Sequence, residues 1–373
     1  MDKYIDIVND SDNGFIVNIG PQHPSTHGVL RLRTHLDGEI IVHMEPYLGY
    51  IHRGIEKMSE NLSYKQIGYL TSRMDYLSAH INNQAVALCV EKGAQIEVPE
   101  RAKYIRVIMA ELQRIASHLL WWGCMGLDLG AVSPFFYAFR EREMILEIFE
   151  ENGGNRLTMN YIIPGGVMMD IRPDFVQKVK DILFSLKSHE PEYQELLTGN
   201  VIFRHRLENV GILTPEQAFD LGCCGPVARA SGISCDVRKM QPYDVYDKVD
   251  FKEIILEKGD CMARYMVRLE EMKQSIHIIE QLIDNIPDGE YRNKQKGAIK
   301  IPEGTYYQKV ETARGELGVY LAADGSAKPW RIKYRTPNFS NLQALKPLVT
   351  GGKIGDLVAI MSTLDLIIPD IDR

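Results

Sequence analysis

Residues 115–139 constrain the fold most, because this apolar run contains a single formally charged side chain, Asp128. The run is long enough to cross a bilayer as one helix. A transmembrane helix is nevertheless disfavoured, since three glycines and Pro134 interrupt the run and a carboxylate lies near its middle. We therefore predict the buried end of one helix, a turn and the start of a second helix, in a chain that is soluble by itself.

Hydrophobic periodicity and proline positions predict long helices on both sides of this run. An apolar stripe at Leu70, Met74, Leu77 and Ile81, with spacings of four, three and four, is typical of a helical face. Proline favours the first turn of a helix, and a proline stands at the start of several of the other predicted helices. The predicted long helices cover residues 61–92, 99–122, 134–152, 173–197 and 251–286.

Alternation of apolar and polar residues predicts strands near both ends of the chain. On the N-terminal side, an antiparallel sheet is expected from residues 14–20, 27–35 and 39–47. On the C-terminal side, strands are expected over residues 306–312, 317–323 and 331–336. The pattern predicts an α+β fold that is mainly α, a bundle of long helices with small antiparallel sheets near the N- and C-termini. One domain over residues 14–373 is expected after an N-terminal extension of residues 1–13.

Composition narrows the possible functions. The chain is 45% hydrophobic and 25% charged, as is usual for a globular protein, and its net charge of −7 argues against a nucleic-acid partner. None of the six cysteines stands in a CxxC pair, so a reducing cytoplasm is expected rather than a disulfide framework or a metal knuckle. The acidic, polar N-terminus lacks the basic-then-apolar order of a signal peptide.

Two histidines lie four residues apart in the segment GPQHPSTHGVLRLR, between two strand-like runs. Prolines and a glycine fix the backbone of this predicted turn, and the imidazoles of His23 and His27 can bind protons near neutral pH. The turn either presents a proton donor to a ligand or is a hairpin whose histidines hydrogen-bond to the backbone. The pattern alone leaves both interpretations open.

A second unusual group of polar residues follows. Tyr69, Arg73, Tyr76 and His80 stand at i, i+4, i+7 and i+11, so they are expected to share one face of the first long helix. Solvated helix faces are usually rich in lysine and glutamate, and this face is not. These side chains either form a functional face or are buried and satisfy one another's hydrogen bonds.

Asp128 lies deep in its apolar run, where an unpaired carboxylate costs several kcal/mol of desolvation. A nearby imidazole would pair with this carboxylate and would have its own pKa raised in return. The alternative is a plain cap for the helix that begins near Pro134.

Several segments together resemble one family closely: GPQHPSTHGVLRL, GYIHRGIEK, SRMDYL, LDLGA followed by PFFYAFRERE, ASGISCDVRK, ETARGELG and the terminal DIDR. They are similar to the D subunit of the proton-pumping NADH:quinone oxidoreductase, respiratory complex I, which is called the 49-kDa subunit in mitochondria. The similarity runs from about residue 14 to residue 373.

The resemblance implies the fold of the large subunit of nickel–iron hydrogenases, from which the metal site has been lost. A nickel–iron site needs four cysteine thiolates in two pairs, and the sequence has no such pairs. Near the C-terminus, where a hydrogenase would have a cysteine pair, this chain has DLIIPD at residues 365–370. No metal is therefore expected in this chain.

The resemblance further implies that quinone occupies the vacated cavity, at the contact with the neighbouring B subunit, which contains the terminal 4Fe–4S cluster. In family terms, Tyr76 and His27 bind the two carbonyls of the quinone headgroup, and Asp128 pairs with His27. The other residues implied in the quinone pocket or near the cluster are His23, Arg53, Arg73 and Cys124.

Quinone reduction takes two electrons and two protons, and a phenol and an imidazolium can donate such protons. Arg73, one turn before Tyr76 on the predicted helix, would compensate the charge of a phenolate. Asp128 would respond to the change in charge on His27. This response would be a first step in coupling quinone reduction to the proton-pumping membrane arm.

Membership of this family implies an enzyme subunit that is active only within the complex, at the cytoplasmic side of a bacterial inner membrane. Its partners would be quinone and the B, C, I and H subunits, with membrane contact through the complex and NAD only in the whole-complex reaction. One alternative is a non-catalytic scaffold subunit of a related ferredoxin-linked or hydrogenase-type membrane complex. Another, a working hydrogenase, is nearly excluded by the missing cysteine pairs.

Two positions depart from the family pattern. Many relatives have a histidine next to the cluster where this chain has Thr158 in the segment RLTMNY. Without that imidazole the potential of the cluster should be lower, which favours menaquinone over ubiquinone. Cys124 stands where a threonine or serine is common, and we expect it to fill space.

Other charged residues are predicted to have structural roles. The four charged residues of FREREM are expected to form ion pairs at a helix start, and Arg229, Arg238 and Asp236 are expected to form ion pairs that fix a loop. His118 is expected in the core. Arg314 and Glu316 are expected in a turn between two strands that faces a neighbouring subunit.

Overall fold

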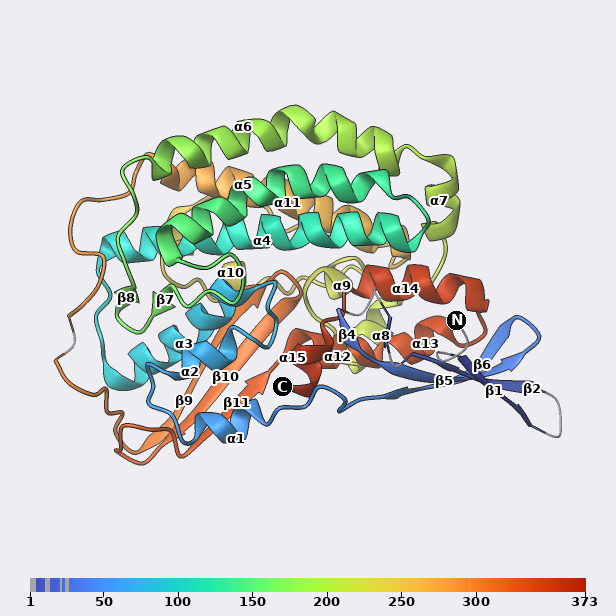
Figure 1. Ribbon diagram of the computed structural model, residues 1–373, viewed down its shortest axis with the longest axis horizontal. Helices are drawn as coiled ribbons and strands as arrows, with labels where there is room; N and C mark the ends of the chain where they lie inside the picture. The colour runs from blue at the N-terminus through green and yellow to red at the C-terminus, as the bar shows by residue number, and fades with distance from the viewer. Residues whose placement is uncertain (1–4, 11–13, 21, 24–26, 295) are drawn as a thin grey trace.

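Long helices and small antiparallel sheets make up the computed structural model, which describes residues 5–10, 14–20, 22–23, 27–294 and 296–373. Figure 1 shows the long helices stacked above one sheet, while the second sheet extends to one side. The predicted α+β fold, with sheets near the two ends of the chain, is confirmed. Within the described ranges, no helix combines the length and the hydrophobicity that a membrane crossing requires.

Helix α4 (Glu100–Asp128) is the centre of the bundle. It packs against α5 (Ser133–Gly153) and α11 (Cys261–Ile283), and α5 packs in turn against α6 (Phe175–Tyr193) (Figure 1). A proline lies at or next to the start of both α4 and α5, as the sequence predicts.

Helix α4 continues past its predicted end because its glycines serve helix packing. A Cβ on Gly123 would lie 3.1 Å from the Cα of Phe135, and one on Gly126 would lie 3.0 Å from the Cβ of Pro134. The missing side chains therefore let α4 and α5 approach each other closely. The apolar run is a helix end, a turn and a helix start, as predicted, and Asp128 is the last residue of α4.

The prediction of a single long helix before α4 is wrong. The chain forms α2 (Ile67–Thr71) and α3 (Ala79–Ala94), with turns between them. Polar side chains in these turns compete for backbone hydrogen bonds. Asp75 Oδ1 accepts from the N–H of Leu77 at 3.0 Å, and Asn82 Nδ2 donates to the carbonyl oxygen of Asp75 at 2.9 Å.

Helix α11 begins at Cys261, later than predicted, because the residues before it pack against another segment. The side chain of Asp260 accepts from the N–H of Ala263 at 2.7 Å and caps the helix. Gly259 has a φ of +65°, and a Cβ there would lie 2.2 Å from the carbonyl oxygen of Leu213. Only glycine fits this approach.

The two main sheets are antiparallel and contain the strands that alternation predicts. The N-terminal sheet has, in spatial order, β1 (Ile5–Asp10), β2 (Gly14–Ile19), β5 (Arg31–Asp37) and β6 (Ile40–Tyr47). The C-terminal sheet has β11 (Arg331–Arg335), β10 (Gly315–Ala323) and β9 (Gly304–Thr312). Residues of the expected N-terminal extension therefore add an edge strand to the first sheet.

The segment with the two histidines is a hairpin, in which β3 (Gln22–His23) pairs with β4 (Gly28–Val29). For this reason β5 starts at Arg31 and not at residue 27. The remaining short elements are α1 (Ile55–Ser59), β7 (Ile162–Ile163), β8 (Gly166–Val167), α7 (Val201–Leu207), α8 (Pro215–Asp220), α9 (Gly225–Arg229), α10 (Val237–Met240), α12 (Pro337–Gln343), α13 (Leu345–Val349), α14 (Leu357–Leu364) and α15 (Ile368–Asp372).

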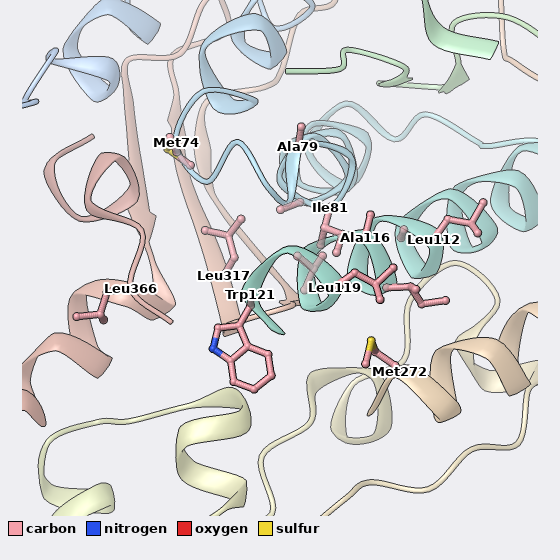
Figure 2. Close-up of a cluster of buried hydrophobic side chains, with 14 of the residues drawn as sticks. Met74, Ala79, Ile81, Leu112, Ala116, Leu119, Trp121, Met272, Leu317 and Leu366 are labelled. Atoms are coloured by element: carbon pink, nitrogen blue, oxygen red, sulfur yellow. The ribbon is translucent and has the colours of Figure 1, made fainter. Parts of the chain in front are cut away.

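The hydrophobic core joins the bundle to the C-terminal sheet. Figure 2 shows Met74, Ile81, Leu119 and Leu317 among the buried side chains that meet between α3, α4 and β10, with Leu366 from the C-terminal segment at one side. The core therefore fixes the turn before α3 against the end of the chain.

The C-terminal segment connects parts of the chain that are far apart in sequence. Trp121 Nε1 donates to the carbonyl oxygen of Ser362 at 2.7 Å, which attaches α14 to α4. The carboxylate of Asp372 accepts from the N–H groups of Gly49 and Ile51, at 2.9 and 3.0 Å. Helix α15 is thus attached to the loop that precedes α1.

Candidate functional site

His27 lies in the turn of the β3–β4 hairpin. Its φ of +44° is left-handed, a conformation that costs a non-glycine residue about 1–3 kcal/mol and that is frequent at functional sites. The next residue, Gly28, packs directly on α15, because a Cβ there would lie 2.9 Å from the Cβ of Ile368. The backbone of His23 pairs with Gly28, while the side chain of His23 lies outside the described residues.

Tyr76 lies in the turn between α2 and α3. Burial raises the pKa of the Tyr76 phenol, the carboxylate of Asp75 raises it further, and Arg314 lowers it. Cys124 and Asp365 also raise the pKa of this phenol, and Arg142 is a further charged neighbour. Tyr76 is therefore a neutral hydrogen-bond donor at pH 7.

The electrostatics of His27 differ from the expectation. Burial lowers the pKa of the imidazole, and Arg314 lowers it further, whereas the carboxylates of Asp365, Asp75 and Asp128 raise it. Asp128 raises the pKa of His27, as the sequence predicts, but burial has the larger effect and the pKa is lowered overall. The ring is neutral at pH 7 and has one N–H to donate.

The two predicted proton donors share their charged neighbours. Asp75, Arg314 and Asp365 act on both His27 and Tyr76, although the histidine comes from a hairpin and the tyrosine from a turn before α3. The structure therefore brings these side chains to one charge cluster.

Arg314 is the centre of this cluster and is fully buried. Its Nη1 lies 3.3 Å from Asp75 Oδ2 and donates to Ser117 Oγ at 2.6 Å, and its Nη2 donates to Asp365 Oδ1 at 3.0 Å. The predicted role of Arg314 in a turn that faces a neighbouring subunit is wrong. The turn is covered by another loop, since a Cβ on Gly225 would lie 2.4 Å from the Arg314 carbonyl oxygen.

Asp365 follows α14 with a φ of +55° and is buried. Its Oδ2 lies 3.8 Å from Nε of Arg268, and within the described ranges neither atom has a hydrogen-bond partner. The Nε of Arg314 is also without a partner in the part of the chain that the structure describes. The cluster thus has spare hydrogen-bonding capacity for water or a ligand.

Asp128 is half-buried at the end of α4 and accepts a hydrogen bond from the hydroxyl of Ser362. It does not cap α5, whose N-cap is Val132 without a capping side chain, so the capping interpretation is wrong. Asp128 acts on His27 through its charge, and its effect is the smallest among the three carboxylates that do so.

Cys124 lies one turn before Asp128 on α4 and neighbours Tyr76. Burial, followed by the charges of Asp128 and Asp365, raises the pKa of this thiol to about 12. The thiol therefore stays protonated, which is consistent with a space-filling role beside the phenol.

Arg53 and Arg73 lie together on the surface. Nη2 of Arg53 donates to the carbonyl oxygens of Arg73 and Pro369, at 2.9 and 3.4 Å. Arg73 donates to the carbonyl oxygen of Tyr69. The cation with the largest effect on the pKa of the Tyr76 phenol is the buried Arg314 rather than Arg73.

The predicted shared face of Tyr69, Arg73, Tyr76 and His80 is wrong, because turns interrupt the helix. Tyr69 is 50% exposed, whereas His80 is fully buried. The ring of His80 packs edge-on against Phe149 with centroids 4.7 Å apart, and burial lowers its pKa to about 3.

Two structural interpretations from the sequence are confirmed. Arg238 and Asp236 form a buried ion pair with an N–O distance of 2.6 Å. His118 is a core residue whose Nε2 lies 3.1 Å from a carboxylate oxygen of Glu271.

Sequence reasoning missed Asp75, Ser117, Arg314 and Asp365 as members of the cluster, and it missed Ser362 as the partner of Asp128. Asp75 directly precedes Tyr76 in SRMDYL, and Arg314 lies in ETARGELG, so both stand in segments that the resemblance already singles out. Asp365 begins the segment that replaces a cysteine pair. Nothing in the sequence pattern signals Ser362.

Known proteins resemble this chain over nearly its whole length. The family described as respiratory-chain NADH dehydrogenase, 49 Kd subunit, matches residues 128–300 and 294–373. The NADH-quinone oxidoreductase C/D subunit of Bacteroides fragilis is 54% identical over 97% of this chain and 68% of that protein. The NADH-quinone oxidoreductase D subunit of Geobacillus thermodenitrificans is 48% identical over 96% of this chain and 98% of that protein. The D subunit of Syntrophobacter fumaroxidans is 48% identical over 96% of each chain.

Proposed function

The chain belongs to the 49-kDa subunit family of respiratory-chain NADH dehydrogenase, and we propose that it provides the quinone-reducing site of that complex. As a member of this family it is an oxidoreductase subunit of complex I, with other complex I subunits as partners. The observation that supports the quinone site is that Tyr76 and His27 share one set of charged neighbours around Arg314.

The two side chains suit the two carbonyl oxygens of a quinone headgroup. Both are neutral at pH 7, so each donates a hydrogen bond without adding a buried charge. Reduction by two electrons makes the quinone oxygens strongly basic, and Tyr76 Oη gives its proton to one of them. The positive charge of Arg314, which lowers the pKa of Tyr76, stabilises the phenolate that remains.

The second oxygen receives its proton through His27. The neutral imidazole binds a proton when negative charge develops on the ring beside it, and it then passes that proton to the oxygen. Asp128 and Asp365 favour the imidazolium during this step, since their charges raise the pKa of His27.

On this proposal the electrons come from the terminal 4Fe–4S cluster of the B subunit, which faces the exposed Arg53 and Arg73. The C, I and H subunits are the further partners, and this chain lies peripherally at the cytoplasmic side of a bacterial inner membrane. NADH enters only in the whole-complex reaction, and ion pumping belongs to the membrane arm.

Replacing His27 by glutamine tests the proposal. We expect quinone turnover of the assembled complex to fall by about 100-fold, because an amide donates a hydrogen bond but transfers no proton. NADH oxidation with an artificial acceptor that takes electrons upstream should stay unchanged. The exposed His205 provides the matched control, His205→Gln, with wild-type quinone turnover. Wild-type turnover in His27→Gln would exclude His27 from proton transfer.

We also propose menaquinone as the substrate, because Thr158 replaces the histidine that many relatives have near the cluster. An imidazole that binds a proton on reduction stabilises the reduced cluster, so its absence lowers the potential. Redox titration of the complex should give the terminal cluster a lower reduction potential than the same cluster has in ubiquinone-using relatives. Thr158→His should raise this potential. An equal potential in the wild-type complex would argue against menaquinone.

A further inference from the structure

Asp370 is a buried carboxyl group whose side-chain partner is neutral. It is 1% exposed on α15, and its Oδ2 accepts from Nδ2 of Asn338 at 2.7 Å. Among the described residues, no lysine, arginine or histidine nitrogen lies within 4 Å of this carboxyl, whereas Asp75 and Asp365 both pair with Arg314. A buried carboxyl without an ion pair favours its protonated form.

Four elements contribute charged or polar groups around Asp370. Asp75 comes from the turn before α3, Arg314 from the β9–β10 turn, and Arg373 from the chain end, while α12 contributes the neutral Asn338. Burial raises the pKa of Asp370 to about 7, and Asp75 raises it too, against the opposing effects of Asn338, Arg373 and Arg314.

Helix α15 also touches the hairpin that contains His27. A Cβ on Gly28 would lie 2.9 Å from Cβ of Ile368 and 3.0 Å from Cδ of Pro369, the residue before Asp370. Asp370 and His27 moreover share the neighbours Asp75 and Arg314. The contact of α15 with the hairpin and the shared neighbours Asp75 and Arg314 therefore bring Asp370 to the same charge cluster as His27.

The proton balance of the proposed site lacks one donor. Two protons are needed for each quinol, and Tyr76 has one of them. His27 is neutral at rest, because burial lowers its pKa, so it has no proton to give without becoming an imidazolate. A second group that is protonated at rest is therefore required near the hairpin.

We propose that Asp370 stores this second proton and delivers it to His27, an inference that rests on the proposed quinone site. The O–H bond of the Asp370 carboxyl breaks, a ring nitrogen of His27 gains the proton, and the quinol oxygen then receives it. The carboxylate of Asp370 remains and is protonated again from solvent. Asp370 does not touch quinone. It acts only through His27, by holding the proton that His27 later passes on.

The pH dependence of the assembled complex tests this inference. Because the store works only when protonated, wild-type quinone turnover should fall as the pH rises, with a midpoint near 7. Titration of His27 itself does not explain this midpoint, because burial lowers the pKa of His27 and its titration therefore falls at a lower pH. Asp370→Asn should remove the midpoint near 7 and lower the maximal turnover by about tenfold, less than the loss of a direct donor.

Three further variants separate this role from a structural one. Asp370→Glu should restore the midpoint, and Asp372→Asn, on the same helix, should retain it. Asn338→Ala removes the donor that favours the carboxylate, so it should move the midpoint to higher pH even if Asp370→Asn fails to assemble. An unchanged midpoint in Asn338→Ala or Asp370→Asn would overturn the proton store. If His27→Gln and Tyr76→Phe also keep full activity, the proposed function itself fails.

Discussion

Tyr76→Phe should lower quinone turnover of the assembled complex by about 100-fold or more, the largest loss of activity that we expect from a single hydroxyl. The variant keeps the ring and its packing but has no proton for the first quinone oxygen. The turn around residue 76 is fixed by the backbone contacts of Asp75 and Asn82, which do not involve the phenol. Assembly should therefore be intact.

A matched tyrosine on the same segment provides the control. Tyr69 is half exposed and lies seven residues before Tyr76, so Tyr69→Phe should have wild-type turnover. Upstream NADH oxidation with an artificial acceptor should be the same in both variants and in the wild type. Normal quinone turnover in Tyr76→Phe would favour the alternative of a non-catalytic scaffold subunit.

Arg314→Met should cause the largest loss of stability, about 3–5 kcal/mol, because it leaves the buried carboxylates of Asp75 and Asp365 without their shared cation. The change also removes the charge that lowers the pKa of Tyr76, so quinone turnover should fall in whatever complex assembles. The temperature at which the purified complex loses this subunit measures the effect.

Removing the carboxylate that then has no cation should rescue part of the stability, because Asp365 still lies 3.8 Å from Nε of Arg268. Arg314→Met combined with Asp75→Asn should therefore be more stable than Arg314→Met alone. A double variant that is less stable than Arg314→Met would show that the ion pairs do not determine the stability of the cluster.

Much of the fold is predictable from the sequence, because its signals are local. Proline at the starts of α4 and α5 and alternation in the strands depend on residues close in sequence. The prediction fails where side chains override periodicity. The carboxylate of Asp75 and the amide of Asn82 interrupt one expected helix, while Gly123 and Gly126 extend another by allowing close packing.

The candidate site is predictable only in part. The resemblance points to Tyr76 and His27, which the structure gives common neighbours. It does not point to Arg314, since a charged residue in a turn between strands is usually exposed. Its burial depends on the loop at Gly225 and on carboxylates from two distant segments, and no local pattern encodes such contacts. The net effect of burial on His27 is likewise a property of the folded environment.

A structure of the assembled complex with bound menaquinone would test the central claim most directly. We expect one carbonyl oxygen of the headgroup within about 3 Å of Tyr76 Oη and the other at a similar distance from a His27 ring nitrogen, with Arg314 behind the phenol. A headgroup bound away from the hairpin, or a Tyr76–His27 separation too large for one quinone ring to bridge, would contradict the account.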